Sequence, residues 1–168
     1  MAYDFSELNV LVVDDSIHMQ QILRSILASM RIEKVRAVST PAEAFSVIQS
    51  WVPDIILTEL ALGNTDGLDF VRRIRDGADG TNPFVPIFLL TGSTEVARVK
   101  EARDAGVTDV LAKPVSIKAL YDRFVAAVQD PRPYVKTKTY MGPDRRRKDR
   151  PFKGDGKRRT DGSVSKAS

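Results

Sequence analysis

Cysteine is absent from this sequence of 168 residues, and histidine occurs once, at His18. These two facts exclude disulfides, thiolate metal sites and cysteine nucleophiles, and they remove the usual histidine-centred triads and zinc cages. The sequence also lacks any apolar run near the roughly 18 residues that a membrane span needs, and its N-terminus lacks a secretion pattern. We therefore expect a soluble, cytoplasmic protein without a membrane partner, with His18 on its surface.

Charges of both signs are plentiful but unevenly distributed. The net charge is +4, from 26 basic and 22 acidic residues. Residues 136–168 contain twelve basic residues and four aspartates, a local charge of +8, so the rest of the chain carries a charge of −4. An acidic body therefore precedes a strongly basic segment. Such a segment is either a solvated solubility device or a grip for something anionic.

Short apolar runs alternate with helical patterns along the first 130 residues. The runs predict strands at 10–13, 35–38, 54–58, 86–90 and 109–112, and the helical spacing predicts helices at 16–30, 41–50, 66–75, 94–105 and 116–128. A capping box from Thr40 to Glu43 with proline between them supports the second helix start. Regular alternation with right-handed crossovers predicts an α/β fold, a doubly wound five-stranded parallel sheet with helices on both faces.

The alternating pattern stops after Gln129, where the sequence Asp130-Pro131-Arg132-Pro133 breaks it. We expect a folded domain over residues 1–130 and a tail over residues 131–168 that is disordered without a ligand, because the tail lacks an apolar period. The tail contains a repeat, aromatic-x-Gly-x-x-basic-Arg-Arg, which starts at Tyr140 and again at Phe152. We interpret it as a functional duplicated motif; the alternative is an unspecific, adhesive disordered tail.

Polar residues follow the predicted strands of the domain. In a doubly wound sheet the ligand site lies at the carboxyl ends of the strands. The residues at these ends are Asp14, Asp15, Glu59, Thr91 and Lys113. Carboxylates that lie so close together are costly unless a hard cation sits among them, so we expect Mg²⁺ held by Asp14, Asp15 and Glu59. The alternative is that these are ordinary solvated loop residues.

Five segments resemble the signature segments of CheY-like response-regulator receiver domains. They are Leu11-Val12-Val13-Asp14-Asp15-Ser16, Pro53-Asp54-Ile55-Ile56-Leu57-Thr58-Glu59-Leu60, Asp66-Gly67, Leu90-Thr91-Gly92 and Lys113-Pro114. The resemblance covers roughly residues 8–129. It implies the strand order 2-1-3-4-5, a Mg²⁺ site at Asp15 and, through water, Asp14, a phosphoryl contact at Thr91, and a pairing of Lys113 with the acceptor carboxylate.

Glu59 stands where that family places its phosphoryl-accepting aspartate, and this departure puts phosphotransfer in doubt. One extra methylene moves the attacking oxygen by more than about 1 Å, a shift that can cost about 100-fold in rate. Glu59 either imitates a phosphorylated aspartate permanently, by approaching Thr91 or Lys113, or merely neutralises the lysine. Two further departures are Val110, where many relatives have an aromatic residue, and Gly63-Asn64 in place of Pro-Gly. We expect Trp51 to serve in packing rather than in ligand stacking.

The chemistry of the tail fits a guanine nucleotide with several phosphates. Arginine pairs bidentately with phosphate and with the O6/N7 edge of guanine, aspartate accepts from the other guanine edge, and aromatic side chains stack on bases. Duplex DNA is disfavoured because the interleaved aspartates would be an electrostatic cost. Two repeats suggest a ligand with two equivalent halves.

This arrangement resembles the Cle family of CheY-like effectors, which bind cyclic di-GMP through an arginine-rich extension. The resemblance implies that a cyclic di-GMP dimer orders the tail and that the body docks on the flagellar motor switch protein, at the flagellated pole, to control motility. The expected ligand-binding residues are Tyr140, Gly142, Pro143, Asp144, Arg145, Arg146, Arg147, Arg150, Phe152, Lys157, Arg158, Arg159 and Asp161.

Our reading of the sequence is therefore a monomeric, non-enzymatic cyclic di-GMP effector. One alternative is a single-domain phosphorelay response regulator that still accepts phosphate at Glu59. Another is a nucleic-acid-binding regulator, which would bind oligonucleotides with a steep salt dependence and without guanine preference.

Overall fold

The central element of the protein is a parallel sheet, seen in a computed structural model that describes residues 3–92, 96–129, 134–136, 141–143 and 165–167. The sheet has five strands in the order β2-β1-β3-β6-β7. They are β1 (Val10–Val13), β2 (Val35–Val38), β3 (Ile55–Glu59), β6 (Ile87–Thr91) and β7 (Asp109–Ala112). All their pairings are parallel. The predicted fold class and strand order are confirmed.

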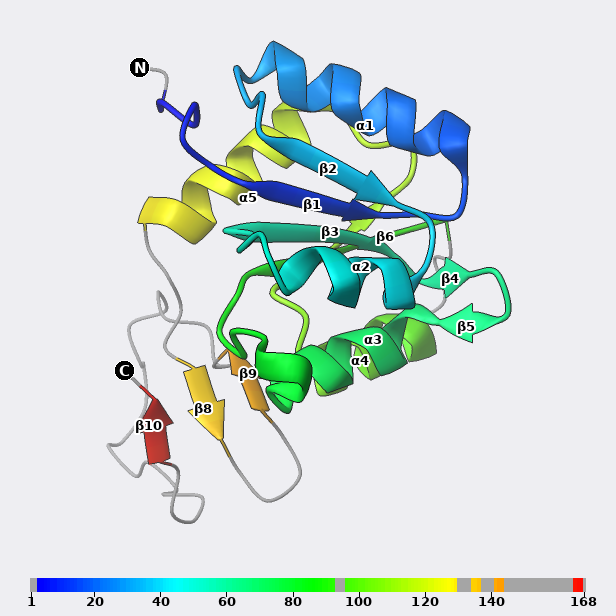
Figure 1. The fold of residues 1–168 in the computed structure, drawn as a ribbon, viewed down its shortest axis with the longest axis vertical. Helices are drawn as coiled ribbons and strands as arrows, with labels where there is room; N and C mark the ends of the chain where they lie inside the picture. The colour runs from blue at the N-terminus through cyan, green and yellow to red at the C-terminus, as the bar shows by residue number, and fades with distance from the viewer. Residues whose placement is uncertain (1–2, 93–95, 130–133, 137–140, 144–164, 168) are drawn as a thin grey trace, which may run out of the picture.

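Helices cover both faces of this sheet, as Figure 1 shows. They are α1 (Ile17–Ser29), α2 (Pro41–Ile48), α3 (Gly67–Arg75), α4 (Val96–Ala105) and α5 (Ile117–Gln129), with a short 3-10 turn, η1 (Ala78–Gly80). Helices α1 and α5 lie on one face, and α2, α3 and α4 lie on the other. The predicted helices are therefore all present, with ends that differ from the predicted ones by up to two residues.

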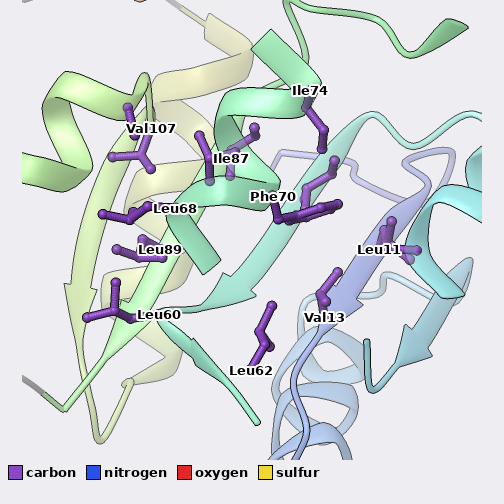
Figure 2. Close-up of a cluster of buried hydrophobic side chains, with 14 of the residues drawn as sticks. Leu11, Val13, Leu60, Leu62, Leu68, Phe70, Ile74, Ile87, Leu89 and Val107 are labelled. Atoms are coloured by element: carbon purple, nitrogen blue, oxygen red, sulfur yellow. The ribbon is translucent and has the colours of Figure 1, made fainter. Parts of the chain in front are cut away.

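The two faces of the sheet bury separate apolar clusters because successive side chains of a strand point to opposite sides. Leu11 and Val13 of β1 belong to the cluster beneath α2, α3 and α4, part of which is drawn in Figure 2. Val10 and Val12 belong to the cluster beneath α1 and α5. Both clusters lie under every central strand, so the ends of these strands are held in fixed positions relative to one another.

Helices α1, α2 and α3 begin at the carboxyl edge of the sheet, and each of them has a side-chain N-cap. Ser16 Oγ accepts from the Met19 N–H at 3.2 Å, and Thr40 Oγ1 accepts from the Glu43 N–H at 3.1 Å. Asp66 Oδ1 accepts from the Leu68 N–H at 2.9 Å. These caps satisfy backbone donors that the first helical turn leaves unpaired. They also fix where the chain turns after β1, β2 and β3.

A short hairpin between β3 and α3 was not among the expected elements. Strands β4 (Ala61–Leu62) and β5 (Thr65–Asp66) pair antiparallel around the Gly63-Asn64 turn. Gly63 has φ of 60°, which a two-residue hairpin with glycine at its first central position requires. The hairpin places the turn beside the carboxyl end of β1.

The region after α5 also contains strands that the sequence did not predict. The described parts of it are β8 (Tyr134–Lys136), β9 (Met141–Pro143) and β10 (Ser165–Ala167), which form an antiparallel sheet in the order β10-β8-β9. The central strand β8 therefore uses both of its edges (Figure 1). Within the described parts of the chain, no helix is long and apolar enough to cross a membrane.

Candidate functional site

Four side chains of the expected site lie at the carboxyl edge of the five-stranded sheet. Asp14 directly follows β1, Glu59 ends β3, Thr91 ends β6, and Lys113 directly follows β7. The register pairs Val13 with Thr58, and Thr91 with Ala112, so the strand ends lie level with one another. The parallel topology therefore brings residues that are far apart in sequence to one place, as predicted.

Asp14 is fixed by three hydrogen bonds, one to β2 and two to α1 and its N-cap. It is 2% exposed, and its Oδ1 accepts from the Ser16 N–H at 2.8 Å. Its own N–H donates to the Val38 carbonyl at 3.0 Å, and its carbonyl accepts from Gln20 Nε2 at 2.7 Å. The carboxylate is therefore held in one position before any ligand arrives. Gln20, a buried polar residue of α1, was missed by the sequence analysis; its signal is an amide on the helix side that faces the sheet.

Glu59 and Lys113 form an ion pair at the centre of the pocket. Glu59 Oε2 contacts Lys113 Nζ, and Glu59 Oε1 accepts from the N–H of the next residue, Leu60, at 2.9 Å. Lys113 Nζ also lies 3.5 Å from Asp14 Oδ2. Apart from this ammonium, neither Glu59 Oε2 nor Asp14 Oδ2 has a hydrogen-bond donor among the described residues. A single cation thus neutralises two carboxylates that are almost completely buried.

The pocket keeps Lys113 charged. Burial is the largest single influence and lowers the pKa of Lys113, but the hydrogen bond and charge of Glu59, together with those of Asp14, outweigh it and raise the pKa above its usual value. The backbone holds the lysine as well, because its N–H donates to the Thr91 carbonyl at 3.0 Å. Lys113 is therefore an ammonium throughout the physiological pH range.

The backbone of Gly67 lies very close to the carboxyl end of β3 and helps to position Glu59. Its N–H donates to the Leu60 carbonyl at 2.7 Å, and a Cβ added at Gly67 would lie 2.2 Å from the Glu59 carbonyl oxygen. Any side chain at this position would push the backbone of Glu59 away. The structure thus gives a steric reason for glycine in the Asp66-Gly67 segment.

Asp15 is placed differently from the other two carboxylates. It is exposed, and its Oδ2 accepts from the Gly63 N–H at 3.0 Å, which ties it to the β4–β5 turn. Among the described residues, no three acidic, histidine or cysteine side chains form a group that could hold a metal ion. The expected magnesium set of Asp14, Asp15 and Glu59 is therefore not gathered: Lys113 occupies two of the carboxylates and the turn occupies the third. The residues in this arrangement do not fit Mg²⁺.

The remaining body residues lie as follows. Thr91 is buried, at 4% exposure, and Val110 packs partly buried against the cluster beneath α2, α3 and α4. His18 is exposed on α1, as predicted. Trp51 packs against the same apolar cluster as Val110, and the guanidinium of Arg36 lies 4.9 Å from its ring centre. The prediction that Trp51 serves in packing is confirmed.

The tail residues of the expected ligand site fall almost entirely outside the described residues. Gly142 and Pro143 lie in β9, where both are buried. Gly142 pairs with Val135, and Pro143 pairs with Tyr134. The others lie outside the described part of the chain: Tyr140, Asp144, Arg145, Arg146, Arg147, Arg150, Phe152, Lys157, Arg158, Arg159 and Asp161.

Comparison with known proteins places the body in a family. The family model of the response regulator receiver domain matches residues 10–125. The chain is 30% identical over 122 residues to the regulatory protein VirG of Agrobacterium tumefaciens, covering 72% of this chain and 43% of VirG. It is 32% identical over 111 residues to a protein-glutamate methylesterase/protein-glutamine glutaminase of Rhodopseudomonas palustris, covering 64% of this chain and 29% of that protein.

A solved structure agrees with these sequence relatives. The chemotaxis protein CheY4 of Vibrio cholerae superposes with a TM-score of 0.63 at 28% identity, covering 70% of this chain and 95% of that one. The chain spans less than half the length of the two curated relatives, so their activities as whole proteins do not transfer to it. What they share with it is the sequence of the receiver domain. The chain therefore belongs to the response regulator receiver domain family.

Proposed function

We propose that this receiver protein is a non-enzymatic cyclic di-GMP effector, in which ligand binding to the basic tail replaces phosphorylation as the input. The observation that carries the proposal is the state of Glu59. One of its oxygens accepts from Leu60 and the other contacts Lys113. A nucleophilic carboxylate must present an oxygen in line with the leaving group, and glutamate displaces that oxygen by one methylene.

In this proposal the tail, and not Glu59, provides the groups that respond to a phosphate-containing signal. Residues 144–164 contain nine basic residues and four aspartates, and the arginines come in two clusters. Charge-assisted bidentate pairing with phosphates and guanine edges is among the strongest recognition that side chains offer. A ligand with four guanines and four phosphates, as in a cyclic di-GMP dimer, would use both clusters. The resemblance to the Cle family supports this ligand.

Calorimetric titration of the 168-residue chain with cyclic di-GMP tests the proposal. We expect tight binding by the wild type and a loss of at least about tenfold in affinity for Arg146→Ala, because a charge-assisted pair is removed. Arg72→Ala is the matched control: Arg72 is an arginine of α3 that pairs with Asp69 on the body surface. The proposal fails if the wild type gives no heat, or if Arg72→Ala weakens binding as much as Arg146→Ala.

Docking on the flagellar motor switch protein is the output that we propose for the body. Large apolar side chains of α5 are available for such contact, since Ile117 is 50% exposed and Val128 is 47% exposed. A pull-down with the purified switch protein should give more complex in the presence of cyclic di-GMP. Ile117→Glu should reduce that complex without changing ligand affinity, and equal capture with and without ligand would contradict the proposed output.

Family membership favours a second candidate, a phosphorelay response regulator. Thr91 and Lys113 stand at the strand ends where the resemblance places the phosphoryl contact and the partner of the acceptor. Label from acetyl phosphate that is retained by the wild type and lost in Glu59→Gln would favour this candidate over the effector. A basic regulator of nucleic acids would instead show steeply salt-dependent oligonucleotide binding without guanine preference.

A further inference from the structure

We propose that Lys113 is the resident counter-cation of the acidic pocket, and that its ammonium group excludes a divalent metal from Asp14, Asp15 and Glu59. The proposal concerns the body alone and goes beyond the proposed function, because it holds whatever the tail binds. It makes the body of this receiver protein independent of magnesium.

The contacts of Lys113 are those of a cation that fills its site. Its side chain is 23% exposed, whereas the carboxylate side chains of Glu59 and Asp14 are 11% and 3% exposed. The ammonium contacts one buried oxygen of each carboxylate, Glu59 Oε2 and Asp14 Oδ2. Buried carboxylates need a paired cation, and this pairing supplies one without an ion from solution.

A divalent ion would need the same oxygens in another geometry. Mg²⁺ requires near-octahedral oxygen ligands at about 2.0–2.1 Å and gives up its waters reluctantly. Asp15, the third expected ligand, has one oxygen engaged with the Gly63 N–H. A metal between Asp14 and Glu59 would also lie beside the ammonium of Lys113, and like charges at such distances repel strongly in a partly buried site. Lys113 must leave before the metal can enter.

The length of Glu59 lets it hold Lys113 in place. Its carboxylate bridges the backbone N–H of Leu60 and the ammonium of Lys113 at once. Lys113 is anchored from the other side by the bond from its own N–H to Thr91. Both partners of the ion pair are thus tied to strand ends that the core fixes.

Each carboxylate of the pocket has its own backbone reporter, and this permits a direct test. The amides of Ser16, Leu60 and Gly63 donate to Asp14, Glu59 and Asp15, respectively. Proton–nitrogen correlation spectra of the 168-residue chain would be recorded during titration with MgCl₂ at constant ionic strength. We expect the three amide shifts to stay unchanged in the wild type through millimolar Mg²⁺.

Removal of the ammonium should open the site. In Lys113→Met the three reporter amides should move together and saturate, with Mg²⁺ affinity at least about tenfold above that of the wild type, because the repelling charge has gone. Lys118→Met, at an exposed lysine of α5 that pairs with Asp122, is the matched control and should behave as the wild type. If Lys113→Met does not fold, Lys113→Gln replaces it.

Two results would overturn the proposal. One is saturable movement of the three amides in the wild type at submillimolar Mg²⁺, which would show that metal and ammonium share the pocket. The other is a folded Lys113 variant that binds Mg²⁺ no better than the wild type, which would show that the ammonium is not the excluding group. Neither result depends on cyclic di-GMP, so the proposed function is tested separately.

Discussion

Different interactions stabilise the receiver body and the segment that follows α5. The body buries two apolar clusters on the two faces of a five-stranded sheet. The following segment is described as three strands of three residues each, joined by backbone pairing. Apolar burial grows with the area removed from water, whereas a small antiparallel unit is marginal alone. The comparison teaches that apolar burial stabilises the body, whereas the described part of the segment is joined by backbone pairing, so its stability is the more sensitive of the two to any ligand that it binds.

The largest expected effect is a loss of body stability when a buried side chain of the body is truncated. Phe124 is fully buried and packs on Phe88, with ring centres 5.6 Å apart. Phe124→Ala should lower the free energy of unfolding by about 3–5 kcal/mol, because transfer energy is lost and a cavity remains. Urea unfolding followed by circular dichroism measures this loss. Val128→Ala, on the exposed side of the same helix, should cost less than about 0.5 kcal/mol.

Arginine substitutions should give the next largest effect, on ligand affinity and not on body stability. Arg146 and Arg158 occupy equivalent positions in the repeat, so each should weaken cyclic di-GMP binding by about tenfold to hundredfold when changed to alanine. Calorimetric titration compares them with Lys153→Ala, a basic residue at a position of the second copy that the repeat does not specify. Unequal losses for the two arginines would show that the repeat does not contact two equivalent ligand halves.

Lys113 should contribute an intermediate, pH-dependent stability to the body. Its pKa is raised in the folded protein, so its stabilisation is complete below the ordinary lysine value of 10.5 and is lost as the pH rises above that value. Lys113→Met should cost about 1–2 kcal/mol at neutral pH, because two buried carboxylates lose their cation at a partly exposed site. Urea unfolding from pH 8 to pH 12 should show the two proteins converging at the alkaline end. A constant difference would contradict this role.

The smallest effect should come from the small sheet. Val135 pairs with Gly142 on one side of β8 and with Lys166 on the other. Val135→Pro should disrupt both pairings, because proline lacks the N–H and fits poorly in a central strand. Ligand affinity should fall severalfold, with no change in body unfolding. Val135→Thr, which keeps the N–H, is the control, and equal affinity of the two variants would show that the pairing is irrelevant to binding.

Most of the body could be predicted because its signals are local and repeated. Continuous apolar runs mark buried parallel strands, as at Val10–Val13, and the Thr40-Pro41 start of α2 follows from capping chemistry. The gathering of Asp14, Glu59 and Lys113 followed from topology alone, since parallel strands share one carboxyl edge.

Other features depend on contacts that have no sequence period. The β4–β5 hairpin consists of a two-residue turn between two strands of two residues each, and such strands are too short to show an alternation of apolar and polar residues. The hairpin also explains why Asp15 lies apart from Asp14 and Glu59, because the Gly63 N–H donates to one of the Asp15 oxygens. The strands after α5 were not predicted because the sequence there lacks an apolar period, and the pairing of backbone groups in such short strands does not require one.

The position of β8 between β9 and β10 has a consequence for how the two arginine clusters of the tail would bind one ligand together. Pro143 at the end of β9 pairs with Tyr134, and Ser165 at the start of β10 pairs with Lys136. The two anchors of the intervening 21 residues therefore lie on opposite edges and at opposite ends of β8, roughly 12 Å apart. The arginine cluster of one repeat is therefore tethered to that of the other. Under the proposed function, a ligand held by one cluster would meet the second cluster at an effective concentration in the millimolar range, and two modest affinities would combine into one strong avidity.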